Sequence, residues 1–415
     1  MSASRGPQAE RRTGRRRAPR RLRWLLPAAL LAVVLAAALV RAASEHVPPV
    51  RARRTIAAQV TLPGRPPALA WPQEGQAAVE VEGVGSLGTF GDQTPVPIAS
   101  VAKMMTAYLT LREHPLSAGQ SGFVITVNAV QAAEEHVRAA EGQSVVPVRA
   151  GERLSERQAL QALMLPSANN VAAMLAVHDA GSTDAFVAQM NAQARALDMR
   201  STTYTDPSGF LDTTLSTASD QLKLVRAAMS ISTFTQIVDT SAARLPVAGV
   251  VHNYDDLVGA EGYVGVKTGS DRAAGGCLAF AKRVTVDGHR FMVLGVVLGQ
   301  RDGELIEAAL AASHQLGNSA AAALGTRTAM SAGTRVLTLT AADGQHAAAR
   351  TSRPLQVLGW PGLRVPVTVA IHHAGVSVDA GQQLARVQIK GASTAAVASS
   401  SLAKPSFGWR LNHLF

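Results

Sequence analysis

The chain has 415 residues, of which 47% are hydrophobic, and it carries a formal net charge of +11. This length is sufficient for two domains, each with its own core. Nine arginines and one glutamate before residue 24 account for +8 of the charge, so the remaining residues carry only +3. Because the basic charge is concentrated at one end, the composition argues against a nucleic-acid partner.

The basic segment, residues 1–23, is followed by an uncharged apolar stretch at residues 24–40, "WLLPAALLAVVLAAALV". This stretch is marginal for a membrane-spanning helix, which needs about 20 residues, and long for a signal peptide, whose apolar region has about 7 to 15. Arginines that precede such a stretch stay in the cytoplasm, so we expect the remaining chain to be exported. Two interpretations remain open: a single-pass anchor in the cell membrane, or a signal peptide cleaved after about residue 43, which would release a secreted protein.

The exported part divides into three predicted regions. Residues 41–55 are polar and contain Pro-Pro, which predicts an extended linker. Residues 56–325 mix helical and strand patterns, and residues 326–415 contain short β-rich segments separated by Gly, Pro and Asp turns. We therefore predict an α+β domain followed by a small all-β domain.

Three local patterns in the α+β region are specific enough to predict elements. Apolar spacing predicts a buried helix that begins near Ser100. A second helix is predicted to begin at Ser155, which forms a capping box with Gln158, and to end before Pro166. The stretches "CLAFAKRVTV" and "HRFMVLGVVLG" are joined by "DGH", which predicts a β-hairpin.

Cysteine and histidine usage limits the possible chemistry. The single cysteine, Cys277, cannot form an internal disulfide, and its apolar neighbours predict a buried, unreactive thiol. The eleven histidines are scattered and no His-Glu-x-x-His spacing occurs, so we predict no metal site and no cofactor.

Three motifs occur in a fixed order along the α+β region: "SVAK" from Ser100, "SAN" from Ser167 and "VKTGS" from Val266. Each has an ordinary explanation by itself, because serine is a favoured helix N-cap and Ser-x-x-Lys recurs at Ser401. All three together, each beside a matching helix or strand, are improbable by accident. We therefore predict that they form one site.

The first motif is suited to nucleophilic acyl transfer. On a helix, residues i and i+3 share a face, so Lys103 can reach the hydroxyl of Ser100. A lysine acts as a base only when it is neutral. Lowering its pKa from about 10.4 to near 7 costs about 4 to 5 kcal/mol, which requires burial and a second nearby cation. Lys267 is the candidate for that cation.

The second motif supplies two polar side chains. Ser167 is predicted to relay a proton to the leaving amine. The amide of Asn169 can hydrogen-bond both to a substrate and to Lys103.

The third motif is predicted to bind the substrate. Glycine at Gly269 lets a substrate backbone lie beside the strand, and Lys267 and Thr268 can bind a terminal carboxylate. The backbone N–H groups of Ser100 and Ser270 are predicted to form an oxyanion hole.

This combination of motifs is similar to that of penicillin-binding proteins and class A β-lactamases. The chain most resembles the low-molecular-mass D-alanyl-D-alanine carboxypeptidases, over about residues 85–300. The matching stretches are "PIASVAKMMTAYL", "GERLSERQALQALMLPSANNVAAMLA", "TDPSGFLDTTLSTASD" and "GYVGVKTGSDRAAGGCLAFA".

The resemblance implies a DD-peptidase fold, in which a helical cluster lies beside an antiparallel sheet with the active site between them. It implies that Ser100 is acylated by the D-Ala-D-Ala end of a peptidoglycan stem peptide and that β-lactam antibiotics acylate it as mimics. The apolar N-terminal segment, which we expect to contact the membrane, differs from the C-terminal amphipathic helix that anchors other members. The sequence departs from the family pattern at Tyr254, Asp255 and Ser270, which leaves substrate preference and rate open.

Three alternatives share the same motifs. A class A β-lactamase needs a glutamate between the second and third motifs, but residues 171–260 contain none and the next is Glu261. A non-catalytic cell-wall binding protein is disfavoured because every catalytic residue is present. A DD-endopeptidase that cuts cross-links remains compatible with the sequence.

Overall fold

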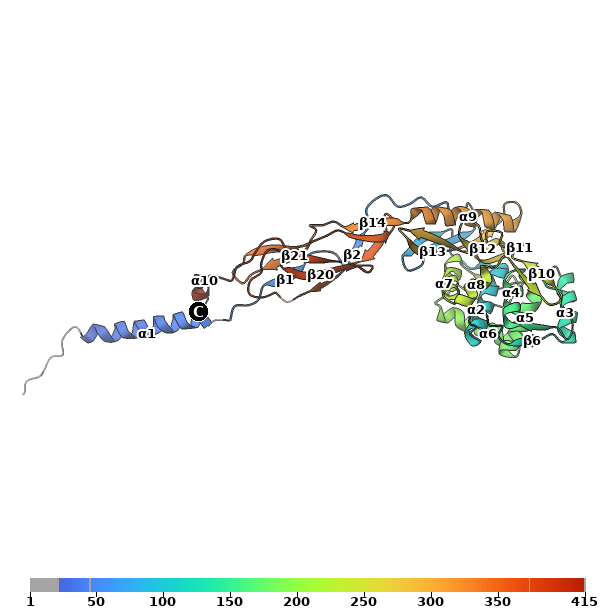
Figure 1. Ribbon diagram of the computed structural model, residues 1–415, viewed down its shortest axis with the longest axis horizontal. Helices are drawn as coiled ribbons and strands as arrows, with labels where there is room; N and C mark the ends of the chain where they lie inside the picture. Colours follow the sequence, from blue (N-terminus) through green and yellow to red (C-terminus); the bar gives the residue numbers. More distant parts are fainter. Residues whose placement is uncertain (1–21, 45, 373, 414–415) are drawn as a thin grey trace, which may run out of the picture. The chain divides into compact units, whose positions relative to one another are not determined.

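The computed structural model describes residues 22–44, 46–372 and 374–413 (Figure 1). The predicted basic segment 1–23 lies almost wholly outside the described residues. The chain divides into two compact units. The mixed unit comprises Thr61–Thr328 and Gln356–Arg364, and the β unit comprises Met1–Val60, Ala329–Leu355 and Val365–Phe415.

The mixed unit is built on a five-stranded antiparallel sheet with the strand order β11-β12-β13-β3-β4. The strands are β3 (Gln76–Val81), β4 (Gly85–Phe90), β11 (Tyr263–Asp271), β12 (Gly275–Val286) and β13 (His289–Gln300). The predicted hairpin is confirmed, because β12 pairs with β13. Its turn residues Asp287 and Gly288 have φ values of 50° and 78°, as a two-residue turn of the primed type requires.

Both faces of this sheet are covered, which explains why its strands are apolar on both sides. Neighbouring residues of a strand point to opposite faces. Val79 packs against α9 (Leu305–Ala323) on one face, while its neighbour Ala78 packs into the helical cluster on the other. Figure 1 shows α9 along one side of the sheet and the cluster on the other. As predicted, the fold is α+β, with helices beside an antiparallel sheet.

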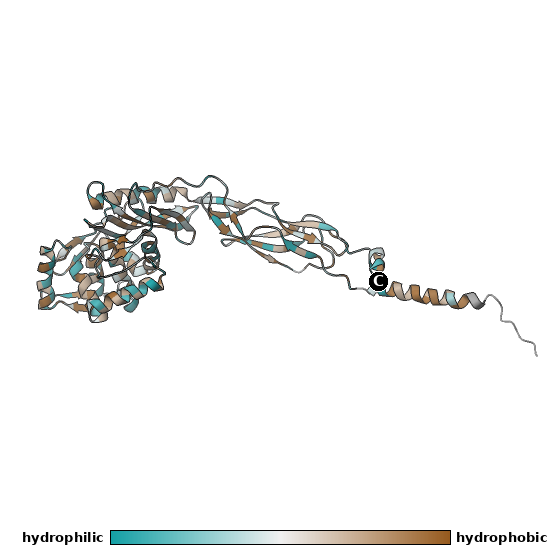
Figure 2. Cartoon of the chain, turned by 180° about the vertical axis from the view of Figure 1, so that it is seen from behind, coloured by the Kyte–Doolittle hydropathy of each residue, from teal (hydrophilic) through white to brown (hydrophobic). Residues whose placement is uncertain are grey.

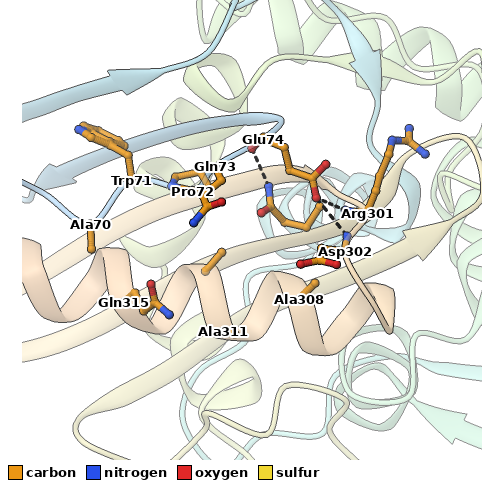
Figure 3. A pocket seen from close by; sticks show the side chains of 12 residues that line it. Ala70, Trp71, Pro72, Gln73, Glu74, Arg301, Asp302, Ala308, Ala311 and Gln315 are labelled. Atoms are coloured by element: carbon orange, nitrogen blue, oxygen red, sulfur yellow. Dashed lines mark hydrogen bonds between the residues drawn. The ribbon is translucent and has the colours of Figure 1, made fainter.

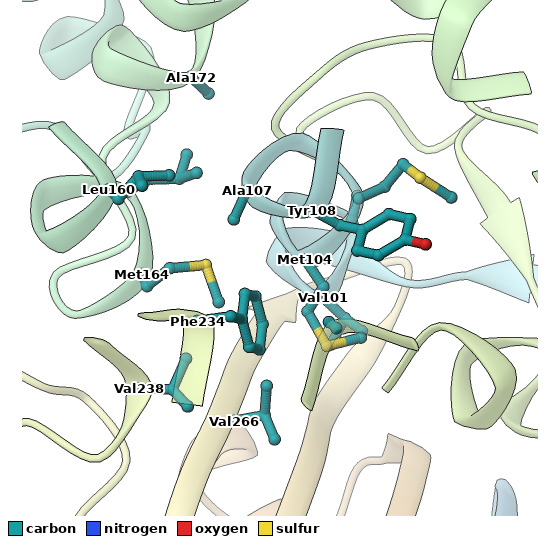
Figure 4. Packing of buried hydrophobic residues seen from close by; sticks show 14 of the residues in the cluster. Val101, Met104, Ala107, Tyr108, Leu160, Met164, Ala172, Phe234, Val238 and Val266 are labelled. Carbon is teal, nitrogen blue, oxygen red and sulfur yellow. The ribbon is translucent and has the colours of Figure 1, made fainter. Parts of the chain in front are cut away.

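The helical cluster surrounds α2, which follows a short 3₁₀ helix. Its elements are η1 (Ala99–Ala102), α2 (Lys103–Glu113), α3 (Ala129–Ala140), α4 (Glu156–Met164), α5 (Asn169–Ala180), α6 (Thr183–Ala196), α7 (Ala218–Met229) and α8 (Ser232–Val238). The capping box of Ser155 and Gln158 is confirmed at the start of α4. In Figure 4, Met104 of α2 lies among Met164, Phe234 and other buried side chains.

Short strand pairs complete the mixed unit and its borders. They are β5 (Val96–Pro97) with β8 (Leu215–Ser216), β6 (Val124–Thr126) with β7 (Arg153–Ser155), β9 (Ala242–Leu245) with β10 (Gly249–His252), β2 (Gln59–Thr61) with β18 (Arg364–Pro366), and β14 (Gly325–Met330) with β17 (Leu355–Gly359).

The β unit contains a six-stranded antiparallel sheet with the order β1-β15-β16-β21-β20-β19. Its strands are β1 (Arg51–Arg54), β15 (Arg335–Thr340), β16 (His346–Thr351), β19 (Thr368–Ile371), β20 (Gln383–Ile389) and β21 (Ala392–Ala398), and a short helix, α10 (Phe407–Asn412), follows.

The structure differs from the predicted domain limits in two places. Residues 51–54 were expected in a linker, but they form β1, which pairs with β15. Three arginines made this stretch look like a polar tether, whereas charged side chains are common on the edge strand of a sheet. Residues 356–364, expected in the β domain, belong to the mixed unit, where Trp360 is buried against α9 and its sheet.

The N-terminal helix α1 (Leu22–Ser44) is longer than the predicted apolar stretch. The segment Leu25–Ser44 is long and apolar enough to cross a membrane, with a mean hydropathy of 2.3. Only about 6% of it is buried. Figure 2 shows the helix in the brown of hydrophobic residues. A membrane anchor and a signal sequence both have these properties.

Candidate active site

Ser100 and Lys103 lie next to each other where η1 passes into α2. Lys103 Nζ is 2.7 Å from Ser100 Oγ and 2.9 Å from the carbonyl oxygen of Ser208. The side chain of Lys103 is fully buried. Ser100 is not a helix cap, because the N-cap position of η1 is Ile98 and no side chain caps it. The serine hydroxyl is therefore available to the lysine amine.

The surroundings of Lys103 favour its neutral form. Burial lowers the pKa of Lys103 well below its usual value of 10.5, and the charge of Lys267 lowers it further. The carboxylate of Asp206 acts in the opposite direction. A neutral amine at hydrogen-bond distance can accept the proton of Ser100 when the hydroxyl attacks a carbonyl.

A turn at residues 205–210 supports Lys103, and the sequence reasoning assigned it no role. Asp206 accepts hydrogen bonds from the N–H and hydroxyl of Ser208 and from the hydroxyl of Thr214. These bonds fix the turn that directs the Ser208 carbonyl at Lys103. The Asp-Pro-Ser-Gly composition of this stretch is a turn signal that could have marked it.

Glycine at position 209 is required by close packing. Gly209 has a φ of 74°, and a Cβ there would lie 1.8 Å from the carbonyl oxygen of Ala99. Ala99 itself has a φ of 45°, which is unusual for a residue other than glycine. The backbone directly before Ser100 is thus held in a strained conformation by the turn beside it.

The second motif places two buried side-chain oxygen atoms at the start of α5. Ser167 has a φ of 66° and does not cap α5, whose N-cap is Ala168. Among the described residues, its buried Oγ and the Oδ1 of Asn169 have no hydrogen-bond partner. Asn169 was expected to bond to Lys103, but its amide donates to Gln143 at 2.9 Å instead. Buried polar atoms of this kind are suited to receive a substrate.

The third motif runs along β11, where Lys267 and Thr268 are buried and lie 3.4 Å apart, Nζ to Oγ1. Burial lowers the pKa of Lys267 to about 7, against the opposing charge of Asp255. Burial likewise raises the pKa of Asp255 to about 6, and Lys267 opposes that rise. The two groups therefore influence each other's charge.

Gly269 brings β11 into contact with η1. A Cβ at this position would lie 2.9 Å from the backbone nitrogens of Ser100 and Val101. The absence of a side chain thus lets the third motif approach the nucleophile. The next residue, Ser270, is exposed and lines a pocket of about 570 Å³ together with Tyr254 and Leu305.

Two further pockets differ in their relation to the motifs. A pocket of about 180 Å³ is lined by Asn169, Asp206 and Ser208, so it lies directly beside the second motif. A pocket of about 670 Å³ lies between the loop around Glu74 and α9 and contains no motif residue (Figure 3). There the carboxylate of Glu74 accepts the N–H of Arg301 at 2.6 Å, so it stabilises a loop.

The structure brings all three motifs together at the junction of the helical cluster and the sheet. This fold and this arrangement of Ser, Lys, Ser-x-Asn and Lys-Thr-Gly define a serine DD-peptidase. The sequence pattern of the D-alanyl-D-alanine carboxypeptidase family matches residues 88–302, so the chain belongs to that family.

Relatives and solved structures agree with this assignment. The chain is 36% identical over 186 residues to the D-alanyl-D-alanine carboxypeptidase DacB2 of Mycobacterium tuberculosis, a match that covers 43% of this chain and 59% of the relative. It is 34% identical over 142 residues to a D-alanyl-D-alanine endopeptidase of Pseudomonas aeruginosa, covering 34% of this chain and 42% of the relative. These matches thus span only about half of each relative's length.

Among solved structures, the DD-transpeptidase of Streptomyces K15 is similar over 62% of this chain and 98% of its own, with a TM-score of 0.52 and 26% sequence identity. This similarity agrees with a serine DD-peptidase fold.

Proposed function

We propose that the chain is a serine-type D-Ala-D-Ala carboxypeptidase that removes the terminal D-alanine from peptidoglycan stem peptides through an acyl-enzyme on Ser100. The observation that carries the proposal is the 2.7 Å contact between Ser100 Oγ and the buried amine of Lys103. A base and a nucleophile at this distance are what acyl transfer requires.

The remaining motif residues have assigned roles in this proposal. Lys103 accepts the proton of Ser100 as Oγ attacks the carbonyl between the two D-alanines, and the N–H groups of Ser100 and Ser270 stabilise the oxyanion. Ser167 relays the proton to the leaving amine. Water then hydrolyses the acyl-enzyme, which regenerates Ser100.

Substrate binding in the proposal uses the second and third motifs. Lys267 and Thr268 bind the carboxylate of the terminal D-alanine, Gly269 admits the peptide backbone beside β11, and the amide of Asn169 bonds to the stem peptide. Penicillin carries a carboxylate beside a reactive amide, so we propose that it acylates the same serine.

A DD-endopeptidase is the second candidate. A relative that carries this name shares 34% identity with the chain, and the pocket of about 570 Å³ beside Ser270 is large enough for more than a single alanine side chain. An endopeptidase cuts a cross-link between two stem peptides, whereas a carboxypeptidase removes a single terminal residue.

Product analysis distinguishes the two candidates. The full chain in detergent is incubated with a stem pentapeptide and, separately, with a cross-linked muropeptide dimer, and the products are identified by mass spectrometry. We expect release of free D-alanine from the pentapeptide, and none from Ser100→Ala. Cleavage of the dimer alone would establish the endopeptidase, and no cleavage of either substrate would contradict both candidates.

We also propose that α1 anchors the protein in the cell membrane, with the mixed unit on the extracytoplasmic side. Its exposed apolar surface supports this proposal. Intact-mass measurement of the mature protein tests this proposal. An uncleaved chain in the membrane fraction supports the anchor, whereas a cleaved signal peptide would shorten the chain at its N-terminus. Protection of the mixed unit from external protease in intact spheroplasts would contradict the proposed orientation.

A further inference from the structure

A cluster of two histidines and an aspartate lies outside the three motifs. His114 directly follows α2, and His178 and Asp179 lie in the last turn of α5. Each of the three residues offers one potential ligand atom, and these atoms all lie within 4.8 Å of one another. Asp179 Oδ1 is 2.8 Å from His178 Nδ1 and 3.4 Å from His114 Nε2.

These separations suit a small divalent cation. A tetrahedral Zn²⁺ site with bonds near 2.0 Å places its ligand atoms about 3.3 Å apart. Two imidazoles and a carboxylate form a ligand set that prefers transition metals, whereas Ca²⁺ and Mg²⁺ prefer oxygen ligands. Only small side-chain shifts separate the observed geometry from such a site.

The carboxylate of Asp179 is buried and held in place from outside the cluster. Its side chain is only 3% exposed. Its second oxygen, Oδ2, accepts a hydrogen bond of 2.6 Å from the hydroxyl of Thr110. Metal-binding carboxylates are commonly oriented by a hydrogen bond of this kind.

A buried carboxyl group with one unpartnered oxygen lies beside the cluster. Glu156, the first residue of α4, is 1% exposed, and among the described residues its Oε1 has no hydrogen-bond partner. It lines the same pocket as His114 and Phe123, and it is close enough for the charges of Asp179 and His178 to act on it. This oxygen is therefore available to a further hydrogen-bond donor or to a cation nearby.

The backbone adds negative potential at the same place. The C-terminal end of a helix carries a partial negative charge. The ends of α2 and α5 meet at this cluster, because His114 caps α2 and His178 lies in the last turn of α5. Phe123 stacks on His178, with ring centroids 3.9 Å apart. A buried acidic group at two helix ends is destabilised unless a cation offsets it.

We propose that His114, His178 and Asp179 bind a divalent transition-metal ion of the Zn²⁺ class. The ion joins the C-terminal ends of α2 and α5. Since α2 begins with Lys103 and α5 begins with Asn169, the ion has a structural role and stabilises the pair of helices that carry two of the motifs. The alternative is that protonated histidines alone pair with Asp179.

Metal titration of the full chain tests the proposal. The protein is purified in detergent without a histidine tag, stripped of metal with a chelator, and titrated with Zn²⁺ against a colorimetric zinc indicator. We expect one equivalent of Zn²⁺ to bind, with no comparable binding of Mg²⁺ or Ca²⁺. His114→Ala and His178→Ala should each weaken binding about tenfold or more.

His136→Ala is the matched control. His136 also lies beside a carboxylate, 3.1 Å from Glu135, but it is 84% exposed and belongs to no such cluster. Zn²⁺ should raise the melting temperature of the wild-type protein and of this control, but not that of His178→Ala. Far-UV circular dichroism of each variant, compared with that of the wild-type protein, shows that it is folded.

The outcomes separate the two explanations. No stoichiometric Zn²⁺ binding by the wild-type protein would overturn the proposal in favour of histidine–aspartate ion pairs. Unchanged Zn²⁺ binding in a folded His178→Ala would also overturn it, since the ion would then bind elsewhere. Because the readouts are metal binding and melting temperature, failure of the proposed peptidase activity would leave this result unaffected.

Discussion

At the scale of single residues, Lys103 and Lys267 are both buried, with 0% and 1% of their surface exposed. Burial disfavours a charged amine at both positions, and the charge of Lys267 lowers the pKa of Lys103 further. Lys103 is shifted towards the neutral form that a base needs. The carboxylate of Asp255 raises the pKa of Lys267 and so favours its charged form. The neighbours of each lysine therefore favour a different role: a neutral base at Lys103 and a carboxylate-binding cation at Lys267.

If Lys103 is the base, its substitution by arginine should slow acylation of Ser100. Lys103→Arg keeps a long basic side chain, but guanidinium does not lose its proton at working pH, so it cannot accept the proton of Ser100. We expect the rate of acylation by penicillin to fall about 10²- to 10⁴-fold. Quenched intact-mass time courses measure this rate, and circular dichroism checks the fold. An unchanged rate would exclude Lys103 as the base.

The pKa shifts also predict a pH profile. Because only neutral Lys103 is a base, acylation should decline as the pH falls through its lowered pKa. Because only protonated Lys267 binds a carboxylate, and its pKa is about 7, KM should increase as the pH rises through 7. A plot of kcat/KM against pH for a stem pentapeptide should therefore be bell-shaped. A profile that is flat from pH 5 to 9 would contradict both assignments.

Asp255 is predicted to set the alkaline side of that profile. Its charge raises the pKa of Lys267, so Asp255→Asn should lower that pKa and increase KM about three- to tenfold at pH 7. Asp256→Asn, at the exposed neighbouring position, is the control and should behave as the wild type. If both variants leave KM unchanged, Asp255 does not influence the charge of Lys267.

At the scale of elements, the site depends on two close approaches to η1. Gly209 lies against Ala99 on one side, and Gly269 of β11 lies against the nitrogens of Ser100 and Val101 on the other. Neither position has room for a Cβ atom. Two segments that are far from η1 in the sequence thus fix the backbone that presents the nucleophile.

This packing predicts a large effect from one methyl group. Gly269→Ala forces β11 away from η1, because its Cβ would lie 2.9 Å from two backbone nitrogens. We expect acylation by penicillin to slow about tenfold or more, since small displacements of reacting groups are costly. Gly325→Ala is the control, because the nearest atom to its Cβ is a side-chain atom at 3.7 Å. Equal rates in both variants would contradict the proposed contact.

The sequence was informative where local patterns determine structure. The helix start at Ser155 and the turn of the β12–β13 hairpin are set by neighbouring residues, and both were predicted. The proximity of Ser100 to Lys103 follows from their spacing of three residues. The bond from Asn169 to Gln143 and the carbonyl of Ser208 beside Lys103 depend on tertiary packing, so the motifs did not reveal them.

Long-range convergence also explains the histidine cluster. His114 and His178 are 64 residues apart in the sequence and looked scattered. They meet because the ends of α2 and α5 pack together, with ring centroids 5.4 Å apart. Residues 51–54 were assigned to a linker for the same reason. Their pairing partner, β15, lies nearly 300 residues further along the chain, so the local sequence does not reveal the strand.

At the scale of the whole molecule, the chain combines an apolar N-terminal helix, a β unit and a mixed unit that holds all three motifs. The β unit contributes no residue to the motifs, and each unit has its own sheet. The placement of all three motifs in the mixed unit is consistent with catalysis confined to that unit. The central claim is therefore the formation of an acyl-enzyme on Ser100.

An intact-mass time course of the full chain with penicillin, followed by peptide mapping, tests that claim most directly. We predict a covalent adduct of one penicillin per chain, located on Ser100, that is lost slowly and is absent from Ser100→Ala. An adduct on another residue, or no adduct with a correctly folded protein, would contradict the account.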